Sequence, residues 1–416
     1  MIKQELKRKD NINARFVLIS DAHITHIKEG YESFEKTMQI TSQLDADGFI
    51  FAGDIAYMHE KAGGGTVNKL YPKAYDIVNE VIDRYIPDLE KVFVIGNHEY
   101  PQHNTEEEIS KESIRLFEEK TGHKFCEHNV VCGYHIITVG ASTYECYFTQ
   151  ETEKWAMQEI DNALTEDDKK PVFVVFHKPP YNTVVNSRKE AGCISEEFRN
   201  YLNSRQRIIN IVGDLHTTAQ DPKTIWQDGF TVVHCPLCAV GEIVFDYYCT
   251  EDHMPSDDKY AQAIVVDICD NIVTMYRIDT IEDAVVSIPW IVDVNDKSSW
   301  KYTNARFKIE IAPYFEDDTQ IFVEYKNGIL TLKVKDAQCE ENDIEAFAAY
   351  YDIKISDINN NEILSESMPS EYYLAKRSGY FAYSKEISLE GKYIVEITPV
   401  TAFYKKGNPI STHFEA

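Results

Sequence analysis

The chain has 416 residues, 43% of them hydrophobic and 27% charged, which is the range of ordinary globular proteins and is enough for two domains. Its formal net charge of -27 disfavours a nucleic-acid backbone or an anionic membrane surface as a partner, because both would repel it. The first ten residues are charged and lack an apolar signal-peptide core, and no stretch reaches the roughly eighteen apolar residues of a membrane span. Nine irregularly spaced cysteines indicate reduced thiols. We therefore expect a soluble, cytoplasmic protein.

Five short apolar runs in the first half of the chain predict buried strands, because they are rich in Val, Ile and Phe. The runs cover residues 15–20, 49–52, 91–95, 172–176 and 208–212. Amphipathic segments predict helices over residues 32–44, 70–89, 105–121, 152–164 and 194–202. The third helix has a capping box, Thr105 with Glu108, and Gly122 as a left-handed cap. Strands that alternate with helices in this way indicate βαβ units.

Four further apolar runs cover residues 133–139, 230–234, 261–268 and 272–278, and the last two have no helix between them. These runs predict a second, more antiparallel sheet. The first 290 residues are therefore expected to form an α/β domain with two sheets face to face and helices outside.

After residue 290 the pattern changes to short runs in which apolar and polar residues alternate. Strands are predicted over residues 306–311, 320–325, 329–334, 349–356, 362–366 and 393–400. Asn327-Gly328 between two of them is a strong hairpin signal. Residues 302–416 should therefore be a C-terminal all-β domain of the immunoglobulin or fibronectin III-like kind, joined by a polar linker over residues 292–302.

The five predicted strands of the first half all end in residue types that bind metal ions. In chain order these are Asp21-Ala22-His23, Gly53-Asp54, Gly96-Asn97-His98-Glu99, His177 and Gly213-Asp214-Leu215-His216. The carboxyl ends of parallel strands meet at one edge of a sheet, where open α/β folds place their sites. A metal centre is expected at that edge.

This order of motifs resembles the calcineurin-like metallophosphoesterase superfamily, whose pattern is D-x-H, G-D, G-N-H-D/E, a lone His and G-H-x-H. The resemblance covers roughly residues 14–280 and implies a two-sheet α/β/β/α sandwich over residues 1–290. Gly53-Asp54-Ile55-Ala56-Tyr57 and Val174-Val175-Phe176-His177 look like the purple acid phosphatase branch of that superfamily. Purple acid phosphatases have D-x-G where this chain has Asp21-Ala22-His23, so Tyr57 is expected to pack beside the site rather than to bind metal.

The resemblance implies a phosphomonoesterase or phosphodiesterase that acts on a small phosphorylated substrate with two divalent or trivalent metal ions (Mn, Fe, Zn or Mg). Two ions about 4 Å apart neutralise phosphoryl oxygens, and a bridging hydroxide attacks phosphorus. The expected ligands are Asp21, His23 and His216 for one ion, Asn97, His177 and Asp214 for the other, and Asp54 for both. His98 would contact the phosphate and act as general acid, and Glu99 would orient the neighbouring histidine.

Four loop residues are weaker candidates for substrate contacts, namely His26, His59, Tyr181 and Asn182. Loop residues of this kind are more often only solvated. Cys235 and Cys238 form a tight pair, but no second pair follows, so a structural strand is favoured over a zinc site.

Asp214 departs from the family pattern, because a carboxylate stands where the pattern has histidine. Aspartate can still bind a metal ion, and its hard oxygen favours Mn, Mg or Fe over zinc. If Asp214 lies away from the ion, the second metal binds weakly. The alternative function is then a metal-binding scaffold on a degenerate phosphoesterase domain, with the β domain as its interaction module.

Overall fold

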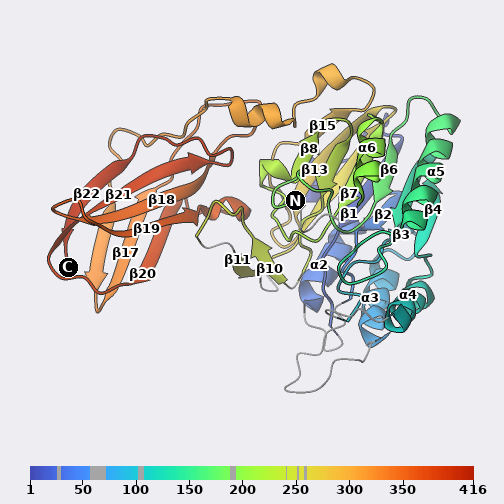
Figure 1. Ribbon diagram of the computed structural model, residues 1–416, viewed down its shortest axis with the longest axis horizontal. Coiled ribbons are helices and arrows are strands. Elements are labelled where there is room, and N and C mark those ends of the chain that lie inside the picture. The colour runs from blue at the N-terminus through green and yellow to red at the C-terminus, as the bar shows by residue number, and fades with distance from the viewer. Residues whose placement is uncertain are drawn as a thin grey trace. The chain divides into compact units, whose positions relative to one another are not determined.

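The computed structural model describes residues 1–25, 30–56, 72–101, 107–187, 194–239, 241–250, 253–256 and 260–416. The chain divides into two compact units, whose elements are labelled in Figure 1. The first unit comprises Met1–Gln220, Thr224–Val244 and Pro255–Thr303, and the second comprises Asp221–Lys223, Phe245–Met254 and Asn304–Ala416. Within the described residues, no helix has the length and apolar character of a membrane span.

The first sheet of the first unit has a parallel part and an antiparallel part. Its order is β14 (Ala284–Val285), β13 (Ile272–Asp279), β12 (Gln262–Cys269), β1 (Ala14–Ile19), β2 (Gly48–Phe51) and β3 (Glu90–Phe93), with β15 (Trp290–Asp293) also on β13. Strands β1, β2 and β3 are parallel, whereas β12 pairs antiparallel with β1. The prediction that β12 and β13 belong to the second sheet is wrong. Their hairpin extends the free edge of β1, where Arg15 bonds Asp267 at 2.7 Å.

The second sheet has the order β4 (Cys126–Val131), β5 (Tyr134–Val139), β6 (Val172–Val175), β7 (Ile208–Val212), β9 (Thr231–His234) and β8 (Ile225–Gln227). Its four central strands, from β5 to β9, are parallel, and only the two edge strands are antiparallel. The expected antiparallel character is therefore wrong for this sheet. A further short strand, β10 (Gly241–Val244), pairs with β11 (His253–Ser256).

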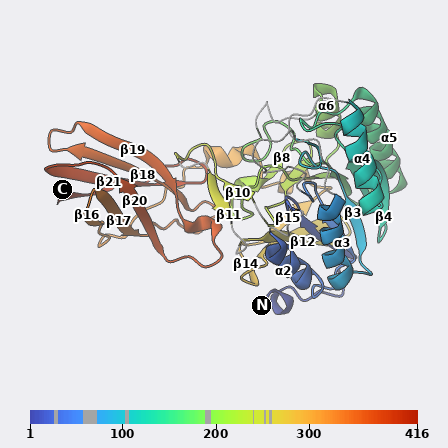
Figure 2. The same ribbon diagram turned by 90° about the horizontal axis from the view of Figure 1, so that it is seen from below.

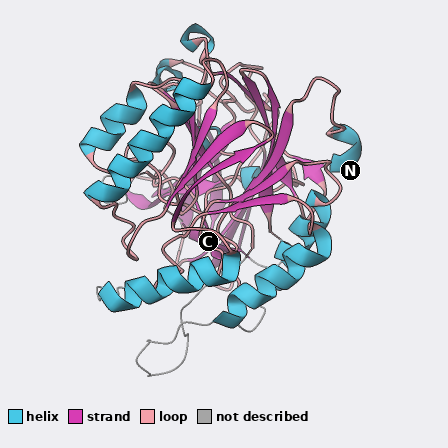
Figure 3. Ribbon diagram, turned by 90° about the vertical axis from the view of Figure 1, so that its right-hand side faces the viewer, coloured by secondary structure: helices cyan, strands magenta, loops and turns pink. Residues whose placement is uncertain are grey.

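Helices cover the outer faces of both sheets, as Figure 3 shows. They are α2 (Tyr31–Thr41), α3 (Pro72–Tyr85) and α4 (Glu107–Thr121) on the first sheet, and α5 (Gln150–Glu166) and α6 (Glu196–Asn203) on the second. Along β1, Val17 packs with the helices while Phe16 and Leu18 pack with the second sheet, because successive strand residues point to opposite faces. The predicted α/β/β/α sandwich and its five helices are confirmed.

Several local predictions have a definite outcome in the structure. Gly122 ends α4 with a φ of 77° and donates its N–H to Glu118 O at 3.0 Å, as a left-handed cap does. Thr105 of the expected capping box lies outside the described residues. Cys235 and Cys238 are buried in the core, and the eight described cysteines are free thiols. A short helix α1 (Ile2–Glu5) was not expected.

The predicted linker belongs instead to the core of the first unit. Val292, Val294 and Tyr302 are buried between the two sheets, and Tyr302 lies edge-on to Trp290 with ring centroids 6.3 Å apart. The linker prediction failed because most residues of this stretch are polar, and the few apolar residues between them gave too weak a signal for a core segment.

The second unit contains two antiparallel sheets whose inner faces share one core. Their orders are β16 (Phe322–Lys326), β17 (Ile329–Lys335), β20 (Tyr380–Glu386), and β19 (Glu362–Pro369), β18 (Ala348–Asp357), β21 (Lys392–Thr401), β22 (Ile410–Glu415). Asn327 and Gly328 join β16 to β17 with φ values of 53° and 79°, so the hairpin prediction is confirmed. The strand predicted over residues 306–311 is wrong, because a 3-10 helix spans Asn304–Lys308. Other 3-10 turns are Pro222–Thr224, Lys297–Ser299 and Glu371–Tyr373.

A chain of hydrogen-bonded side chains ties strands β4 and β5 to helix α5. Glu159 lies 2.6 Å from His128 Nδ1, and His128 Nε2 lies 2.8 Å from His135 Nδ1. Burial, and next the neighbouring His128, lower the pKa of His135 below its usual 6.5. Lys170 acts in the same direction, whereas Glu166 and Asp167 oppose it. The folded protein therefore binds a proton at His135 less readily than the unfolded chain does.

This arrangement predicts a loss of stability in acid. Below pH 6.5 the unfolded chain binds a proton at His135 more readily than the folded protein does, so stability present above that pH is lost as the pH falls. The urea midpoint should fall between pH 7.5 and 5.5 by more in the natural protein than in His135→Gln. Equal falls in the two proteins would contradict this role.

Candidate metal centre

The loops after β1, β2 and β7 place their metal-ligand residues in an uncommon backbone conformation. Asp21, His23, Asp54, Asp214 and His216 have φ values of 53°, 47°, 53°, 72° and 49°. Non-glycine residues seldom adopt this left-handed region, and such strain persists where the surrounding structure enforces it, often at functional sites. Two backbone bonds do so here: Asp21 donates its N–H to Gly53 O at 3.1 Å, and His23 donates to Asp54 O at 3.1 Å.

The glycines of the motifs allow neighbouring loops to approach closely. A Cβ added to Gly53 would lie 2.4 Å from His177 Nδ1, and one added to Gly96 would lie 2.1 Å from Asp54 Oδ1. A Cβ on Gly213 would lie 2.8 Å from Ser20 Cβ. These positions are glycine because a side chain would occupy the space of the metal-ligand residues or of the residue beside them.

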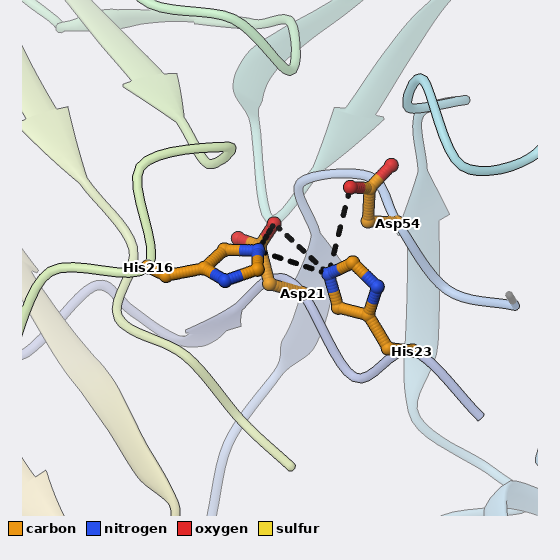
Figure 4. A group of neighbouring side chains, drawn as sticks. All are labelled: Asp21, His23, Asp54 and His216. Carbon is orange, nitrogen blue, oxygen red and sulfur yellow. Dashed lines mark hydrogen bonds and ion pairs between the residues drawn. The ribbon is translucent and has the colours of Figure 1, made fainter. Parts of the chain in front are cut away.

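Four side chains from these loops form one compact group, shown in Figure 4: Asp21, His23, Asp54 and His216. One ligand atom from each lies within 4.8 Å of all the others. His23 Nε2 is 3.6 Å from Asp54 Oδ2, and His216 Nε2 is 3.4 Å from Asp21 Oδ1. The two Nε2 atoms are 3.0 Å apart. Carboxylate oxygens and imidazole nitrogens at these separations suit a single metal ion.

The second ring nitrogen of two histidines is held by a backbone carbonyl. His177 Nδ1 lies 2.7 Å from Ala52 O, and His216 Nδ1 lies 3.1 Å from Glu242 O. A carbonyl only accepts, so each Nδ1 carries the proton and each Nε2 presents a lone pair to the group. This is the arrangement found in metal-binding histidines.

A second set of acceptors lies on the other side of Asp54. His177 Nε2 is 3.1 Å from Asp54 Oδ2 and 3.8 Å from Asp214 Oδ1. Asn97 Oδ1 is buried and, among the described residues, accepts no hydrogen bond. His177 Nε2 is also buried and, within the same residues, makes no hydrogen bond of proper geometry. Acceptors that face one another in a buried place fit a cation between them.

Charge reinforces this conclusion. Burial acts to lower the pKa of His177, but the carboxylates of Asp54 and Asp21 outweigh it and raise the pKa to about 10. Burial acts to raise the pKa of Asp54, and the surrounding histidines bring it below its usual range. For Asp214, burial prevails and raises the pKa, with Lys178 as the main opposing charge. The three buried carboxylates thus favour a proton on His177 when no metal is bound, and a bound cation would supply the same positive charge and leave the Nε2 lone pair free to coordinate.

His98 stands at the open side of the group. Its Nε2 lies 3.9 Å from Asp54 Oδ2, and its side chain is 18% exposed against 1% for Asp54. Its backbone N–H donates to Asp54 Oδ1 at 2.8 Å. Tyr144 lies edge-on to the imidazole with ring centroids 5.8 Å apart. The structure thus places a partly exposed imidazole, that of His98, beside the buried carboxylate of Asp54.

Glu99 has a structural role that the sequence did not suggest. Its carboxylate accepts backbone N–H groups from Gly96 at 2.6 Å, Ala56 at 2.8 Å and Asp54 at 3.1 Å. Burial, with Asp54 next, raises the pKa of Glu99 to about 8. Glu99 therefore ties the loops after β2 and β3 together, and its role in orienting the neighbouring histidine stays a prediction.

The proposed substrate residues have no demonstrated place at the metal centre. Tyr181 is 44% exposed, and Arg199 of α6 lies 5.7 Å from its ring. Asn182 donates its backbone N–H to Ser187 O at 2.7 Å. Over the residues that the structure describes, neither is joined to the ligand group by a hydrogen bond or a ring contact. His26, Tyr57 and His59 lie outside the described residues.

Two residues beside the candidate metal centre, Ser20 and His234, were not predicted from the sequence. Ser20 Oγ donates to Asp21 Oδ2 and lies 3.1 Å from Cys235 O. His234 Nε2 accepts the N–H of Leu215, the residue between Asp214 and His216, at 3.3 Å. The available signal was position, since Ser20 ends the first predicted strand and His234 ends the run over residues 230–234.

Comparison with known proteins extends these observations. Residues 14–217 match the family model of the calcineurin-like phosphoesterases. No curated protein sequence matches the chain. Membership of the purple acid phosphatase branch stays a prediction.

Three solved structures illustrate how distant the structural relatives are. A purple acid phosphatase from yellow lupin (Lupinus luteus) seeds is 12% identical with a TM-score of 0.49, and the match covers 68% of this chain and 55% of the lupin chain. A 5'-nucleotidase precursor from Thermus thermophilus is 12% identical with a TM-score of 0.33 (67% and 54% covered). A conserved uncharacterized protein from Streptococcus pneumoniae, a predicted phosphoesterase, is 9% identical with a TM-score of 0.28 (67% and 97% covered). This chain thus spans about half the length of the lupin protein. The segment that carries the metal-ligand residues, residues 14–217, belongs to the calcineurin-like phosphoesterase family.

Proposed function

We propose that this protein hydrolyses phosphoesters of small substrates with the help of two metal ions. One observation carries the proposal: Asp54 Oδ2 lies 3.6 Å from His23 Nε2 and 3.1 Å from His177 Nε2. A single carboxylate thus faces an imidazole on either side, which is the placement that a ligand shared by two ions requires.

The ligands divide into two sets around Asp54. Asp21, His23 and His216 would hold one ion, and Asn97, His177 and Asp214 would hold the other. Bound ions supply positive charge for the phosphoryl oxygens and lower the pKa of the attacking water. The protein contributes the fixed spacing of the two sets and the imidazole tautomers that keep each Nε2 free to coordinate.

We assign His98 to the phosphoryl group and the leaving oxygen. Its imidazole faces Asp54 at 3.9 Å from the open side of the group. From there it would donate a hydrogen bond to a phosphoryl oxygen and protonate the departing alkoxide.

Asp214 is the residue on which the second ion depends. Its carboxylate lies 3.8 Å from His177 Nε2 and is only 14% exposed, which favours coordination over a solvated side chain. A hard oxygen in place of imidazole nitrogen favours Mn, Mg or Fe at this position.

A substrate and metal screen tests the proposal. The protein, stripped with a chelator, should regain hydrolysis of p-nitrophenyl phosphate, bis(p-nitrophenyl) phosphate or nucleotides when Mn, Fe, Zn or Mg is added. Metal analysis should find about two ions per chain. The ratio of monoester to diester turnover then identifies the reaction class.

The rival function is a scaffold on a degenerate phosphoesterase domain, with the β domain as its interaction module. Asp214 in place of histidine is the observation behind this alternative. Absence of bound metal after incubation with each of the four ions, together with absence of hydrolysis, would favour the scaffold and contradict the enzyme.

We also propose that residues 302–416 form an immunoglobulin or fibronectin III-like sandwich, as their two antiparallel sheets around one core allow. A cytoplasmic location agrees with the free thiols of the eight described cysteines.

A further inference from the structure

The turn after β7 carries two of the seven expected ligands, Asp214 and His216, and it is held at several points. Gly213 packs against Ser20, and Asp214 donates its N–H to the Asp21 carboxylate at 3.2 Å. His216 O accepts the N–H of Val244 of β10 at 3.2 Å. The residue between the two ligands, Leu215, is held by a side chain that has no part in the proposed chemistry.

That side chain is His234, the last residue of β9. It is fully buried, and its Nε2 accepts the Leu215 N–H at 3.3 Å. Burial, the largest effect, lowers the pKa of His234 to about 3, and the ring is neutral. The Gly213 backbone lies beside the ring as well and acts to raise the pKa of His234.

The other ring nitrogen of His234, Nδ1, is not stabilised by a hydrogen bond from the described residues. Nδ1 is buried and, in the described part of the chain, has no hydrogen-bond partner. Buried polar atoms without partners are rare because they lose their hydration. The neighbouring strand residues Val232 and Val233 are apolar and buried, so the polar ring at position 234 is an exception on this strand end. The hydrogen bond from Leu215 to Nε2 is therefore the contact that accounts for a histidine at this position.

The backbone supplies a second reason for such a support. Asp214 and His216 have φ values of 72° and 49°, on either side of Leu215. Residues with side chains leave this left-handed region unless other contacts hold them there. The Leu215 amide lies between the two strained residues, and it donates to Gly213 O at 2.9 Å within the turn and to His234 Nε2 at 3.3 Å from outside the turn.

We propose that His234 is a positioning residue, which fixes the turn Gly213–His216 so that Asp214 and His216 face the metal centre. The proposal rests on the proposed metal-binding function, and it adds a residue that contacts neither metal nor substrate. Residues behind metal ligands typically change metal affinity about 10- to 100-fold when they are lost.

Three variants separate positioning from general stability. His234→Gln places an amide where Nε2 lies and keeps a hydrogen-bonding group for the turn, whereas His234→Leu removes it. Val232→Ala is the matched control, because Val232 is buried two residues earlier on the same strand and lies in the core beneath α5 and α6.

The first measurement uses protein without metal. Hydrogen exchange of the peptide segment 213–218 should be at least about 10-fold faster in His234→Leu than in the natural protein, since the Leu215 amide loses its acceptor outside the turn and keeps only Gly213 O. His234→Gln and Val232→Ala should exchange at the natural rate in this segment. The proposal would be overturned if segment 213–218 exchanged in His234→Leu at the rate of the natural protein, or if Val232→Ala accelerated its exchange as much as His234→Leu does.

The second measurement is the affinity for Mn²⁺, determined by isothermal titration calorimetry. The affinity of at least one site should fall about 10- to 100-fold in His234→Leu and stay near the natural value in His234→Gln. Unchanged Mn²⁺ affinity in His234→Leu would overturn the link between the turn and the metal. If the natural protein itself bound no Mn²⁺, the proposed function would fail, and hydrogen exchange alone would decide whether His234 holds the turn.

Discussion

Replacing Asp54 with asparagine should reduce phosphoester hydrolysis by roughly 10³-fold or more, because the ions it holds supply several kcal/mol of transition-state stabilisation. Asp54 Oδ1 accepts the N–H of His98 at 2.8 Å, so the amide oxygen of asparagine would keep this bond. The NH₂ group would then face His23 and His177, where Oδ2 now stands. A donor at this point repels cations, so metal content should fall together with activity.

The matched control is Asp270→Asn. Asp270 lies in the exposed turn between β12 and β13 and has a φ of 54°, nearly the same as the 53° of Asp54. The same chemical change in the same backbone conformation should leave turnover and metal content as they are. Metal content by atomic emission and turnover of an aryl phosphate are the two readouts. Full activity in Asp54→Asn, with its fold intact by circular dichroism, would refute the proposed metal centre.

Replacing Gly96 with alanine should lower activity by roughly 10²-fold although no ligand is removed. The new Cβ would lie 2.1 Å from Asp54 Oδ1 and 2.3 Å from Asp54 N, so the loop after β2 must move. A displacement of about 1 Å at a reacting centre can have this effect. Overpacking of this kind should also destabilise the fold by about 1–3 kcal/mol.

Gly122→Ala serves as the control for Gly96→Ala. Gly122 has a φ of 77°, and no atom lies within 4 Å of the Cβ that alanine would add. Backbone strain should destabilise this variant by about 1–2 kcal/mol. Its metal content and activity should be unchanged. Urea denaturation gives the stability of both variants, and metal analysis gives their metal content. If Gly96→Ala and Gly122→Ala lose similar stability and bind the same amount of metal, the close approach of Gly96 to Asp54 has no functional role.

The sequence by itself predicted where the candidate metal centre lies. Five apolar runs too short for helices had to be strands, and the residue types at their ends, from Asp21 to His216, could meet only at one edge of a sheet. Local chemistry also settled the cap at Gly122 and the hairpin at Asn327-Gly328, because both require a left-handed backbone that glycine and asparagine adopt readily.

Only the tertiary structure decided the contacts between residues distant in the chain. Nothing local distinguishes β12 as a neighbour of β1 from β12 as part of another sheet, since both arrangements bury the same apolar face. In the same way, Glu99 accepts hydrogen bonds from the amides of Ala56 and Asp54, and His234 accepts one from the amide of Leu215. A sequence motif specifies side chains, whereas these hydrogen bonds are made to backbone N–H groups, which almost every residue has. The sequence therefore contains no signal for them. It identified the candidate ligands, and the fold alone identified the contacts that hold them.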